Sequence, residues 1–450
     1  MAHFLLTPVG SSGDVHPFVG IGRALRARGH DVTLLTTEPF RRVSERAGLR
    51  FVGTQSQEDF DRLTRHPDLW HRRNGLMLVL RTVASVMRDD YARIAGACEP
   101  GRTVLVGHAL SFATRVFEEV HGTPAATIHL APSIVRSDYQ FPPYIPGMDT
   151  SGVPVWVTRS MWWLADRWFI DRAVLPEFNR WRYELGLEPV SRVFKTWLHS
   201  PRRVIGLFPE WFSAMQPDWP PQLRLTGFPL YDEADDHVVS PGLQAFLDRG
   251  SPPVLFTPGS ANRAASRFFA SALDATRRLG RRALFLTPYP EQLPAALGSA
   301  ALGSAAPGSA ALGNTALGSA ALGNTALGSA ALGDDVWHEP YVPLSQVLPR
   351  CAAIVHHGGV GTCAQGLAAG VPQLTMPLGF DQPDNTTRLW RLGVGRWVRP
   401  NQFTGRRVAE TLAALLDDPR VAERCGHWAQ EMRRGDPLAE TCAILEALIP

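Results

Sequence analysis

The chain has 450 residues, with 45 Lys and Arg against 42 Asp and Glu, and 45% hydrophobic and 19% charged residues. This length predicts two or three domains with sizeable cores, and the composition excludes disordered and fibrous classes. A net charge of +3 spread along the chain gives no nucleic-acid footprint. Five widely spaced cysteines without a CxxC motif argue against a disulfide framework or a zinc site. Because the N-terminus lacks a signal-peptide pattern and no apolar run approaches about 18 residues, we expect a soluble, cytoplasmic protein.

The first forty residues have the pattern of a β-α-β unit. Residues 3–9 form an apolar run suited to a buried strand, and the Gly- and Ser-rich residues 10–14 predict a turn. Pro17 suits the first turn of a helix that ends at a glycine, and a second strand follows over 32–36. Apolar runs that continue the alternation of a parallel sheet stand at residues 103–107 and 125–129.

The segment from 153 to 219 holds eight of the 13 tryptophans. Trp buries a large area in any core, so helical packing is one interpretation of this segment. The other is an aromatic wall for an apolar ligand. His108, His129 and His199 could line a cleft, but a histidine beside apolar residues is usually a hydrogen-bonded core group.

The alternating pattern breaks near residue 230 into an acidic stretch and starts again with a strand over 253–257. A loop, a helix and a second strand are expected over residues 258–260, 268–279 and 283–286. We therefore expect a first domain over 1–230, a linker over 231–250, a second domain over 251–435 and a C-terminal helix over 436–450. Two successive α/β units predict two Rossmann-like, doubly wound domains, whose ligands bind at the carboxyl ends of the strands.

A low-complexity segment interrupts the second unit. From 295 to 334 a five-residue unit based on Ala-Ala-Leu-Gly-Ser recurs eight times, with substitutions such as Pro307, Asn314 and Thr325. A pentapeptide-repeat β-helix is one interpretation, but the units are rich in Gly and lack polar outer positions. We expect a repeat expansion in a surface loop, without a chemical role.

The most informative stretch runs from 352 to 385. An apolar strand over 352–355 leads into His356-His357-Gly-Gly-Val-Gly-Thr, and a helix is expected over 363–369. Glycines allow close approach of a ligand to the backbone, and a helix N-terminus presents unpaired N–H groups. The stretch therefore predicts a binding site for a diphosphate. Farther on, Asp381 supplies acceptors and Gln382 both a donor and an acceptor, which suits neighbouring sugar hydroxyls.

This stretch resembles the donor-binding signature of the UDP-glycosyltransferase superfamily (families 1 and 28), with the two-domain GT-B fold. The loop GSSGDVHP at 10–17 is similar to that of bacterial and sterol-type members. Segments that resemble the rhamnosyltransferase subunit of rhamnolipid biosynthesis stand at 196–201, 207–212, 226–230 and 370–373. The resemblance covers nearly the whole chain except the repeat. It implies an α/β chain whose two Rossmann-like domains face each other across a cleft, with hexosyltransferase activity.

The resemblance also implies which residues bind the donor. His357 matches the phosphate-contacting histidine, whereas His356 ends the strand and is expected to be structural. Asp381 and Gln382 match the pair that holds sugar hydroxyls. The remaining matches are Gly359, Gly361 and Thr362 for the phosphate loop, Gly259 and Ser260 for a second loop facing the phosphates, Tyr341 for the nucleobase, and Gln365 for the ribose. Gln365 stands where many UDP-sugar members have a Glu, and a neutral amide is compatible with a deoxyribose donor.

Asp14 is the expected catalytic base, because members of the bacterial branch place an Asp in this loop. Asp is also a favoured N-cap, so capping of the following helix is the alternative interpretation. His16 is the rival base. The transfer needs no metal if His357 and a helix N-terminus neutralise the departing diphosphate. Asp59-Phe60-Asp61 fits the Asp-x-Asp pattern of metal-dependent enzymes but lies in a polar segment, and we interpret it as a solvated face.

The favoured reaction transfers L-rhamnose from dTDP-L-rhamnose to a hydroxyalkanoyloxyalkanoate lipid, with Trp162 and Trp168 on the acceptor side. This resemblance also implies a peripheral contact with the inner membrane and a partner acyl-lipid synthase subunit. A glycosyltransferase acting on a polyketide, sterol or other apolar aglycone is the alternative within the class. A nucleotide-sugar 2-epimerase and a non-catalytic auxiliary subunit are the alternatives from other functional classes. A dinucleotide oxidoreductase is disfavoured, because Gly10-x-x-Gly13 is not the G-x-G-x-x-G fingerprint.

Overall fold

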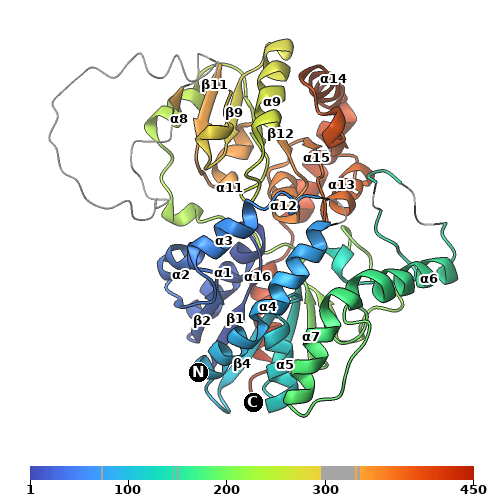
Figure 1. Ribbon diagram of the computed structural model, residues 1–450. Helices are drawn as coiled ribbons and strands as arrows, with labels where there is room; N and C mark the ends of the chain where they lie inside the picture. Colours follow the sequence, from blue (N-terminus) through green and yellow to red (C-terminus); the bar gives the residue numbers. More distant parts are fainter. Residues whose placement is uncertain (72–73, 144, 149, 151, 295–329, 332–334) are drawn as a thin grey trace.

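The computed structural model describes residues 1–71, 74–143, 145–148, 150, 152–294, 330–331 and 335–450. Within these residues the chain forms two α/β lobes, one above the other in Figure 1, and each is built on a seven-stranded sheet. The predicted class, α/β with two doubly wound domains, is confirmed by the strand orders of the two sheets.

The first sheet has the order β3-β2-β1-β4-β5-β6-β7 with every described pair parallel. Its strands are β1 (His3–Thr7), β2 (Asp31–Thr36), β3 (Arg50–Gly53), β4 (Thr103–His108), β5 (Ala125–His129), β6 (Arg203–Gly206) and β7 (Leu223–Leu225). The strand order reverses between β1 and β4. In doubly wound sheets this switch point opens a crevice at the carboxyl ends of the strands.

The second sheet repeats this plan in the order β10-β11-β9-β8-β12-β13-β14. Its strands are β8 (Val254–Thr257), β9 (Ala283–Leu286), β10 (Ala330–Ala331), β11 (Val336–Glu339), β12 (Ala353–His356), β13 (Gln373–Thr375) and β14 (Gly395–Trp397). The short β10 pairs antiparallel with β11 at the edge. Its two residues come from the repeat segment, and the rest of the predicted surface loop lies outside the described residues. The switch point falls between β8 and β12.

Helices pack on both faces of each sheet. In the first lobe they are α1 (Ser12–Ala27), α2 (Arg41–Arg46), α3 (Gln57–Thr64), α4 (Asn74–Ala97), α5 (Phe112–His121), α6 (Val155–Ala165) and α7 (Asp171–Glu184). In the second lobe they are α8 (Pro241–Asp248), α9 (Ser266–Leu279), α11 (Leu344–Val347), α12 (Val360–Ala369), α13 (Gln382–Arg391), α14 (Gly405–Leu416) and α15 (Pro419–Met432). The last helix, α16 (Pro437–Glu446), follows α15.

The start of α1 differs from the prediction. The expected turn at 10–14 with a helix from about Pro17 is replaced by a helix that already begins at Ser12, so Pro17 lies inside it. The reason is a capping box, in which the Ser11 backbone N–H donates to the Asp14 side chain and the Ser11 side chain accepts from the Asp14 backbone. The early start brings the N-terminal turn of α1 to the end of β1.

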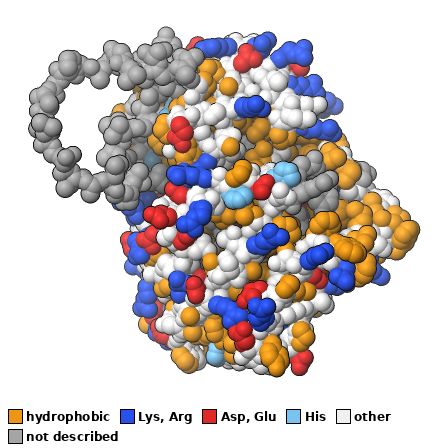
Figure 2. All heavy atoms as spheres, in the orientation of Figure 1, with side chains coloured by type: hydrophobic (Ala, Val, Ile, Leu, Met, Phe, Trp, Pro, Cys, Tyr) orange, Lys and Arg blue, Asp and Glu red, His pale blue; other side chains and the backbone are white. Residues whose placement is uncertain are grey.

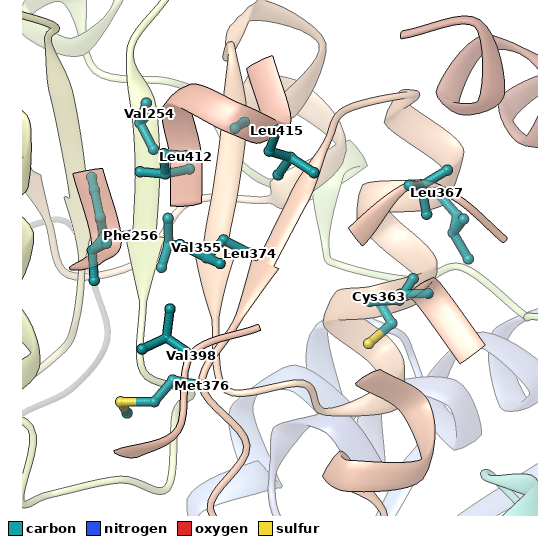
Figure 3. Packing of buried hydrophobic residues seen from close by; sticks show 14 of the residues in the cluster. Val254, Phe256, Val355, Cys363, Leu367, Leu374, Met376, Val398, Leu412 and Leu415 are labelled. Atoms are coloured by element: carbon teal, nitrogen blue, oxygen red, sulfur yellow. The ribbon is translucent and has the colours of Figure 1, made fainter. Parts of the chain in front are cut away.

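The apolar cores follow the alternation of the strands. On one face of the first sheet, β-strand residues such as Phe4 and Val106 pack against α1, and on the other face Leu5 and Leu105 pack against α4 and α5. In the second lobe, Val254, Val355 and Leu374 from neighbouring strands meet Leu412 and Leu415 of α14 (Figure 3). Residues 241–248, within the expected linker, form α8, and its Leu243, Phe246 and Leu247 are part of a core beneath the second sheet.

The C-terminal helix returns to the first lobe. In Figure 1, α16 lies beside α1 in the lower lobe, although the chain has just left α15 of the upper lobe. Cys442 and Leu445 of α16 are fully buried in the core that contains Phe18 and Ile21 of α1. Thr441 also donates a hydrogen bond from its hydroxyl to the Thr226 hydroxyl at 2.9 Å. The chain therefore crosses between the lobes twice.

The tryptophans of 153–219 lie in two different environments, the core and the surface. Four of them are buried core residues, which agrees with the packing interpretation: Trp162, Trp181, Trp197 and Trp219. By contrast Trp156, Trp163 and Trp168 are 71%, 52% and 55% exposed. They belong to α6 and to the π-helical turn that follows it, where hydrophobic side chains gather at the right-hand edge of the molecule (Figure 2). The acceptor contact expected of Trp162 and Trp168 stays a prediction.

Candidate active site

The N-termini of two helices, one from each lobe, meet at the candidate site. The helix α1 follows β1 and α12 follows β12, so both begin at the switch point of their sheet. A Cβ on Gly361 of α12 would lie 3.9 Å from the Cα and the carbonyl oxygen of Gly13 of α1. Val360 packs against the cores of both lobes. Since unpaired N–H groups give each helix N-terminus a partial positive charge, their convergence favours an anionic guest.

Asp14 stands in the first turn of α1 and is partly withdrawn from solvent. Its Oδ2 accepts hydrogen bonds from the Ser11 backbone N–H at 2.7 Å and the Ser11 hydroxyl at 3.2 Å. Burial raises the pKa of Asp14 to about 6, against these hydrogen bonds. Asp14 is thus the third residue of α1 in a capping box, whereas the alternative interpretation expected it to be the N-cap, a place that Ser11 takes. Capping occupies one carboxylate oxygen, so it is compatible with a second role as a base.

His16 lies on a different side of α1 and faces the segment that connects the lobes. Its Nε2 is 3.7 Å from the Oε1 of Glu233, and its ring meets the edge of Tyr231 with the centroids 6.0 Å apart. Burial lowers the pKa of His16 to about 4, so the imidazole is neutral at pH 7. These contacts make His16 a weaker candidate for the base than Asp14.

The His357 ring is fixed between two glycines. A Cβ on Gly359 would lie 2.5 Å from its Nε2, and a Cβ on Gly259 would lie 2.7 Å from its Cε1. Only glycine at both positions leaves room for the ring. Burial lowers the pKa of His357 to about 4, and its Nδ1 is buried without a hydrogen-bond partner among the described residues. A neutral imidazole with a free nitrogen at a helix N-terminus suits a phosphate oxygen.

His356, the preceding residue, is a structural group, as expected. Its Nε2 lies 3.0 Å from the amide oxygen of Gln373, and its Nδ1 accepts from the Gly358 N–H at 3.1 Å. The side chain is fully buried at the end of β12.

The helix α12 begins earlier than predicted. It starts at Val360 rather than Cys363, so Gly361 and Thr362 belong to its first turn instead of a loop. The glycine-rich sequence is compatible with this start because Gly359 provides an extended N-cap. The N–H groups of the first turn have no partner within the helix and are available for a ligand.

Asp381 connects the sugar-binding motif to the phosphate loop. The Nδ2 of Asn385 donates to the Oδ2 of Asp381 at 2.7 Å and to the carbonyl oxygen of Gly358 at 3.1 Å. Burial raises the pKa of Asp381 to about 7, and the negative charge of Asp14 contributes to this rise. The carboxylates of the two lobes therefore interact electrostatically across the site.

Gln382 differs from the expectation that its amide offers both a donor and an acceptor. Its Oε1 accepts hydrogen bonds from the backbone N–H groups of Leu378 and Gly379, at 2.8 and 3.3 Å. A carbonyl oxygen has two lone pairs, and these bonds use both of them. The side-chain NH₂ group is the part of Gln382 that can serve a sugar hydroxyl.

Three further residues were predicted to bind the donor: Tyr341, Ser260 and Gln365. The Tyr341 hydroxyl donates to the Asp232 carbonyl oxygen at 2.8 Å, and burial raises its pKa. Ser260 is exposed, and its carbonyl oxygen accepts from the Tyr289 hydroxyl at 3.1 Å. Gln365 lies one turn after Gly361 in α12 and is 8% exposed. Their contacts with a nucleotide stay predictions.

The interpretation of Asp59-Phe60-Asp61 as a solvated face is wrong for Asp61. Arg263 of the second lobe donates to the Oδ1 of Asp61 at 2.5 Å and to the Thr64 hydroxyl at 3.1 Å. The same guanidinium lies over the Tyr289 ring, 4.5 Å from its centroid. Asp59 is an N-terminal capping residue of α3. The motif is thus a contact between the lobes, which sequence reasoning missed because its partners are about two hundred residues apart.

Phe380 makes another contact that the sequence did not predict. It precedes Asp381, has a left-handed φ of 57°, and meets the Trp70 ring with the centroids 5.7 Å apart. Such backbone is strained for a bulky residue, and strain of this kind concentrates at functional sites. Trp70 belongs to the first lobe, so this pair also joins the lobes beside the sugar-binding motif.

Replacing Asp381 with Asn is expected to stabilise the protein in a pH-dependent way. Burial raises the folded-state pKa of Asp381 from 3.8 to about 7, so the carboxyl favours folding only while it is protonated. This contribution is complete below pH 4 and is lost as the pH rises to about 7. In thermal unfolding the Tm advantage of Asp381→Asn should therefore grow over that window and reach about 5 °C above it.

Asp418→Asn is the matched control for this measurement. Hydrogen bonding to Arg420 lowers the pKa of Asp418, so its removal should give a pH dependence of the opposite sign. If Asp381→Asn raised the Tm by the same amount at pH 4 and at pH 8, the pKa of Asp381 would not be raised by burial.

Two doubly wound lobes, with helix N-termini converging from both sides, define the GT-B fold. Comparisons with known proteins agree. The N-terminal domain model of glycosyltransferase family 28 matches residues 4–137, and the C-terminal domain model of the erythromycin biosynthesis protein CIII-like family matches residues 323–448. O-mycaminosyltylonolide 6-deoxyallosyltransferase of Streptomyces fradiae is 30% identical over 98% of this chain and 96% of its own length.

Solved structures show the same fold. The spinosyn rhamnosyltransferase SpnG superposes with a TM-score of 0.64 at 20% identity, covering 99% of this chain and 100% of its own. The glycosyltransferase VinC in complex with dTDP has a TM-score of 0.64 at 18% identity, covering 99% of both chains. The chain belongs to the glycosyltransferase family 28/EryCIII-like superfamily of GT-B enzymes, and it is a glycosyltransferase. The narrower likeness to rhamnolipid rhamnosyltransferases stays a prediction.

Two further features concern all the described residues. No group of three or more His, Cys, Asp or Glu side chains among them is arranged to hold a metal ion. In the same part of the chain, no helix is long and apolar enough to cross a membrane.

Proposed function

We propose that this enzyme is an inverting glycosyltransferase that moves a 6-deoxyhexose from a dTDP-sugar to a hydroxyl of an apolar aglycone. The observation that carries the proposal is the meeting of α1 and α12 at Gly13 and Gly361. It brings a candidate base of the first lobe, Asp14, to the same centre as a phosphate site of the second lobe, His357. A reaction between a bound acceptor and a bound donor needs both groups at one place.

The transfer replaces one bond of the anomeric carbon with another. The acceptor oxygen attacks the anomeric carbon, its proton goes to Asp14, and the bond from that carbon to the diphosphate oxygen breaks. The leaving diphosphate gains negative charge, which the N-terminus of α12 and an N–H of His357 stabilise without a metal. Attack from the side opposite the diphosphate inverts the configuration at the carbon.

The donor proposal draws on Gln365 and on the relatives. A neutral amide at the expected ribose position is compatible with a deoxyribose, and the similar VinC structure contains dTDP. One relative is named a 6-deoxyallosyltransferase and one structural neighbour a rhamnosyltransferase, which supports a 6-deoxyhexose. Within this class dTDP-L-rhamnose remains the specific candidate.

The acceptor proposal draws on the apolar surroundings of Asp14. Val9, Leu110 and Ile134 are half-buried and pack on a core formed by α4, α5 and α7 of the first lobe. These residues follow the carboxyl ends of β1, β4 and β5, beside the loop that holds Asp14. An aglycone with an extended apolar body would bury this surface. The names of the relatives favour a macrolactone-like natural product over the hydroxyalkanoyloxyalkanoate lipid suggested by the sequence.

The experiment offers purified protein two donors, dTDP-L-rhamnose and UDP-glucose, and two acceptors, a hydroxylated macrolactone and a β-hydroxydecanoyl dimer. Mass spectrometry measures transfer, and NMR of the product measures the anomeric configuration. We expect rhamnosyl transfer to the macrolactone with inversion. Transfer only to the dimer would replace the acceptor, transfer only from UDP-glucose would replace the donor, and retention would overturn the mechanism. Interconversion of donor sugars without an acceptor would indicate an epimerase instead.

A further inference from the structure

An ion pair connects the first lobe to the loop that follows β8 in the second. Asp61 lies in α3, at the side of the first lobe that faces the second (Figure 1). Its Oδ1 accepts from the Arg263 guanidinium at 2.5 Å, and this guanidinium also donates to the Thr64 hydroxyl at 3.1 Å. Gln57 and Arg65 of the same helix donate to the carboxylate as well, at 2.9 and 3.4 Å. The position of the Asp61 carboxylate is therefore fixed within the first lobe.

Arg263 ends a loop with a predicted role in donor binding. The loop runs from Gly259 to Arg263 after β8, and Ser260 within it is expected to face the donor phosphates. The Arg263 guanidinium lies over the Tyr289 ring, 4.5 Å from its centroid, and the Tyr289 hydroxyl donates to the Ser260 carbonyl oxygen at 3.1 Å. A continuous series of contacts therefore runs from Asp61 of the first lobe to Ser260 of the second.

The other end of the loop touches the predicted phosphate-binding histidine. Gly259 has a left-handed φ of 92°, and a Cβ on it would lie 2.7 Å from the Cε1 of His357. On the inner side of the loop, the Nε2 of Gln292 donates to the Asn262 carbonyl oxygen at 2.8 Å. The loop is thus held at the His357 ring, at Gln292 and at Arg263. Because it is short, release of Arg263 would be transmitted to the backbone beside His357.

The charge of Arg263 is already occupied in this arrangement. The guanidinium pairs with Asp61, its flat face lies on Tyr289, and the Arg263 and Asp61 side chains are only 18% and 24% exposed. An arginine without such partners would attract a diphosphate directly. The pairing therefore favours a role in which Arg263 fixes the backbone of the loop, whose N–H groups and Ser260 hydroxyl are the groups that meet a phosphate.

We propose that Asp61 is a positioning residue for the donor, which acts through Arg263 and Tyr289 to hold the Gly259–Ser260 loop in the conformation that binds the donor diphosphate. This inference rests on the proposed function, because it requires a nucleoside diphosphate beside His357. The acceptor lobe then raises the affinity for the donor, and the donor site is complete only while α3 contacts the second lobe. These residues make and break no bond of the substrates.

The test measures the binding of dTDP to the full-length protein by calorimetry. Asp61→Ala removes the carboxylate and keeps a good helix former in α3. We expect the Kd of dTDP to rise about tenfold, as for the loss of one charged hydrogen bond. The sign is diagnostic. Because dTDP is an anion, removal of a negative charge would by long-range electrostatics alone lower the Kd.

Two variants of the same helix are the matched controls. Glu58 carries the same charge one turn before Asp61 and is exposed, so Glu58→Ala should not raise the Kd. Asp61→Glu keeps the carboxylate and should retain most of the affinity for dTDP. Together the two controls separate the position of the Asp61 carboxylate from the charge and the integrity of α3.

Tyr289→Phe tests the same series of contacts from the second lobe. It changes no charge, keeps the ring beneath Arg263 and removes only the hydrogen bond to Ser260. We expect it to raise the Kd about threefold. The double variant with Asp61→Ala should lose less affinity than the product of the two single losses, because both substitutions act on one loop. Tyr289→Phe carries the test if Asp61→Ala shows no cooperative unfolding.

The outcomes separate this inference from the proposed function. If the wild-type protein binds dTDP and Asp61→Ala binds it equally well, the inference is overturned and the proposed function stands. A lower Kd in Asp61→Ala would also overturn it, because the released Arg263 would then itself be a phosphate ligand. An equal rise in Glu58→Ala would overturn it as a general disturbance of α3. If the wild-type protein does not bind dTDP, the proposed donor class and the inference fail together.

Discussion

Asp14→Asn is expected to lower kcat by about 10²–10⁴-fold and to leave the Kd of dTDP unchanged. The amide keeps the size of the side chain and can still accept the hydrogen bond from the Ser11 N–H, which is 2.7 Å in the native protein. It cannot take a proton from the acceptor. The loss should therefore appear in the chemical step, measured by single-turnover transfer, while calorimetry shows intact nucleotide binding.

The pH profile gives an independent check of the same residue. Because burial raises the pKa of Asp14 to about 6, activity that needs its carboxylate should fall as the pH drops through that value. Asp381, with a pKa raised to about 7, interacts with Asp14, so the acid limb should report two coupled protonations rather than one. His16→Asn is the comparison variant, and we expect a change in kcat below about tenfold. If kcat fell as much in His16→Asn as in Asp14→Asn, or more, His16 and not Asp14 would be the base.

Gly359→Ala is expected to lower kcat/KM for the donor by about 100-fold. The new Cβ would lie 2.5 Å from the Nε2 of His357, a distance that no pair of these atoms tolerates, so the ring must leave its position between the glycines. A displacement of about 1 Å in a positioned group is enough for this effect. Initial rates at varied donor concentration measure the change.

A double-variant cycle tests whether the glycine acts through the histidine. His357→Ala alone should give a similar loss, and the combined variant should lose no more than either one, because both remove the same interaction. Gly426→Ala is the control, since a Cβ on this α15 residue meets no atom within 4 Å among its described neighbours. Additive losses in the double variant would mean that Gly359 contacts the donor by its own backbone and independently of His357.

The sequence was informative where function depends on local pattern. The glycines around His357 and the Asp381-Gln382 pair each carry their signal within a few residues, and the two β-α-β units are visible as apolar alternation. Segment boundaries were less accurate where side chains compete with the turn signals. Ser11 and Asp14 form a capping box, so α1 begins at Ser12, several residues before the predicted start near Pro17.

Contacts between the lobes could not be predicted, because no local pattern marks them. Asp61 looked like a solvated carboxylate, yet its partner Arg263 belongs to the other lobe. His129 looked like a core residue among β-branched and apolar neighbours, and only the assembled sheet shows that its nitrogens have no protein partner among the described residues. Both properties depend on which distant segments the topology brings together.

The return of α16 to the first lobe has a consequence for the order in which the protein can mature during synthesis. Domains generally fold as units while the chain is being made, N-terminal domain first. Here Cys442 and Leu445, which follow the whole second lobe in the sequence, are fully buried in the core around Phe18. The ribosome must therefore deliver the whole second lobe before the first lobe can close its core. Until then the apolar side of α1 stays open to solvent and to chaperones, so emergence of the first sheet alone does not complete the core of the first lobe.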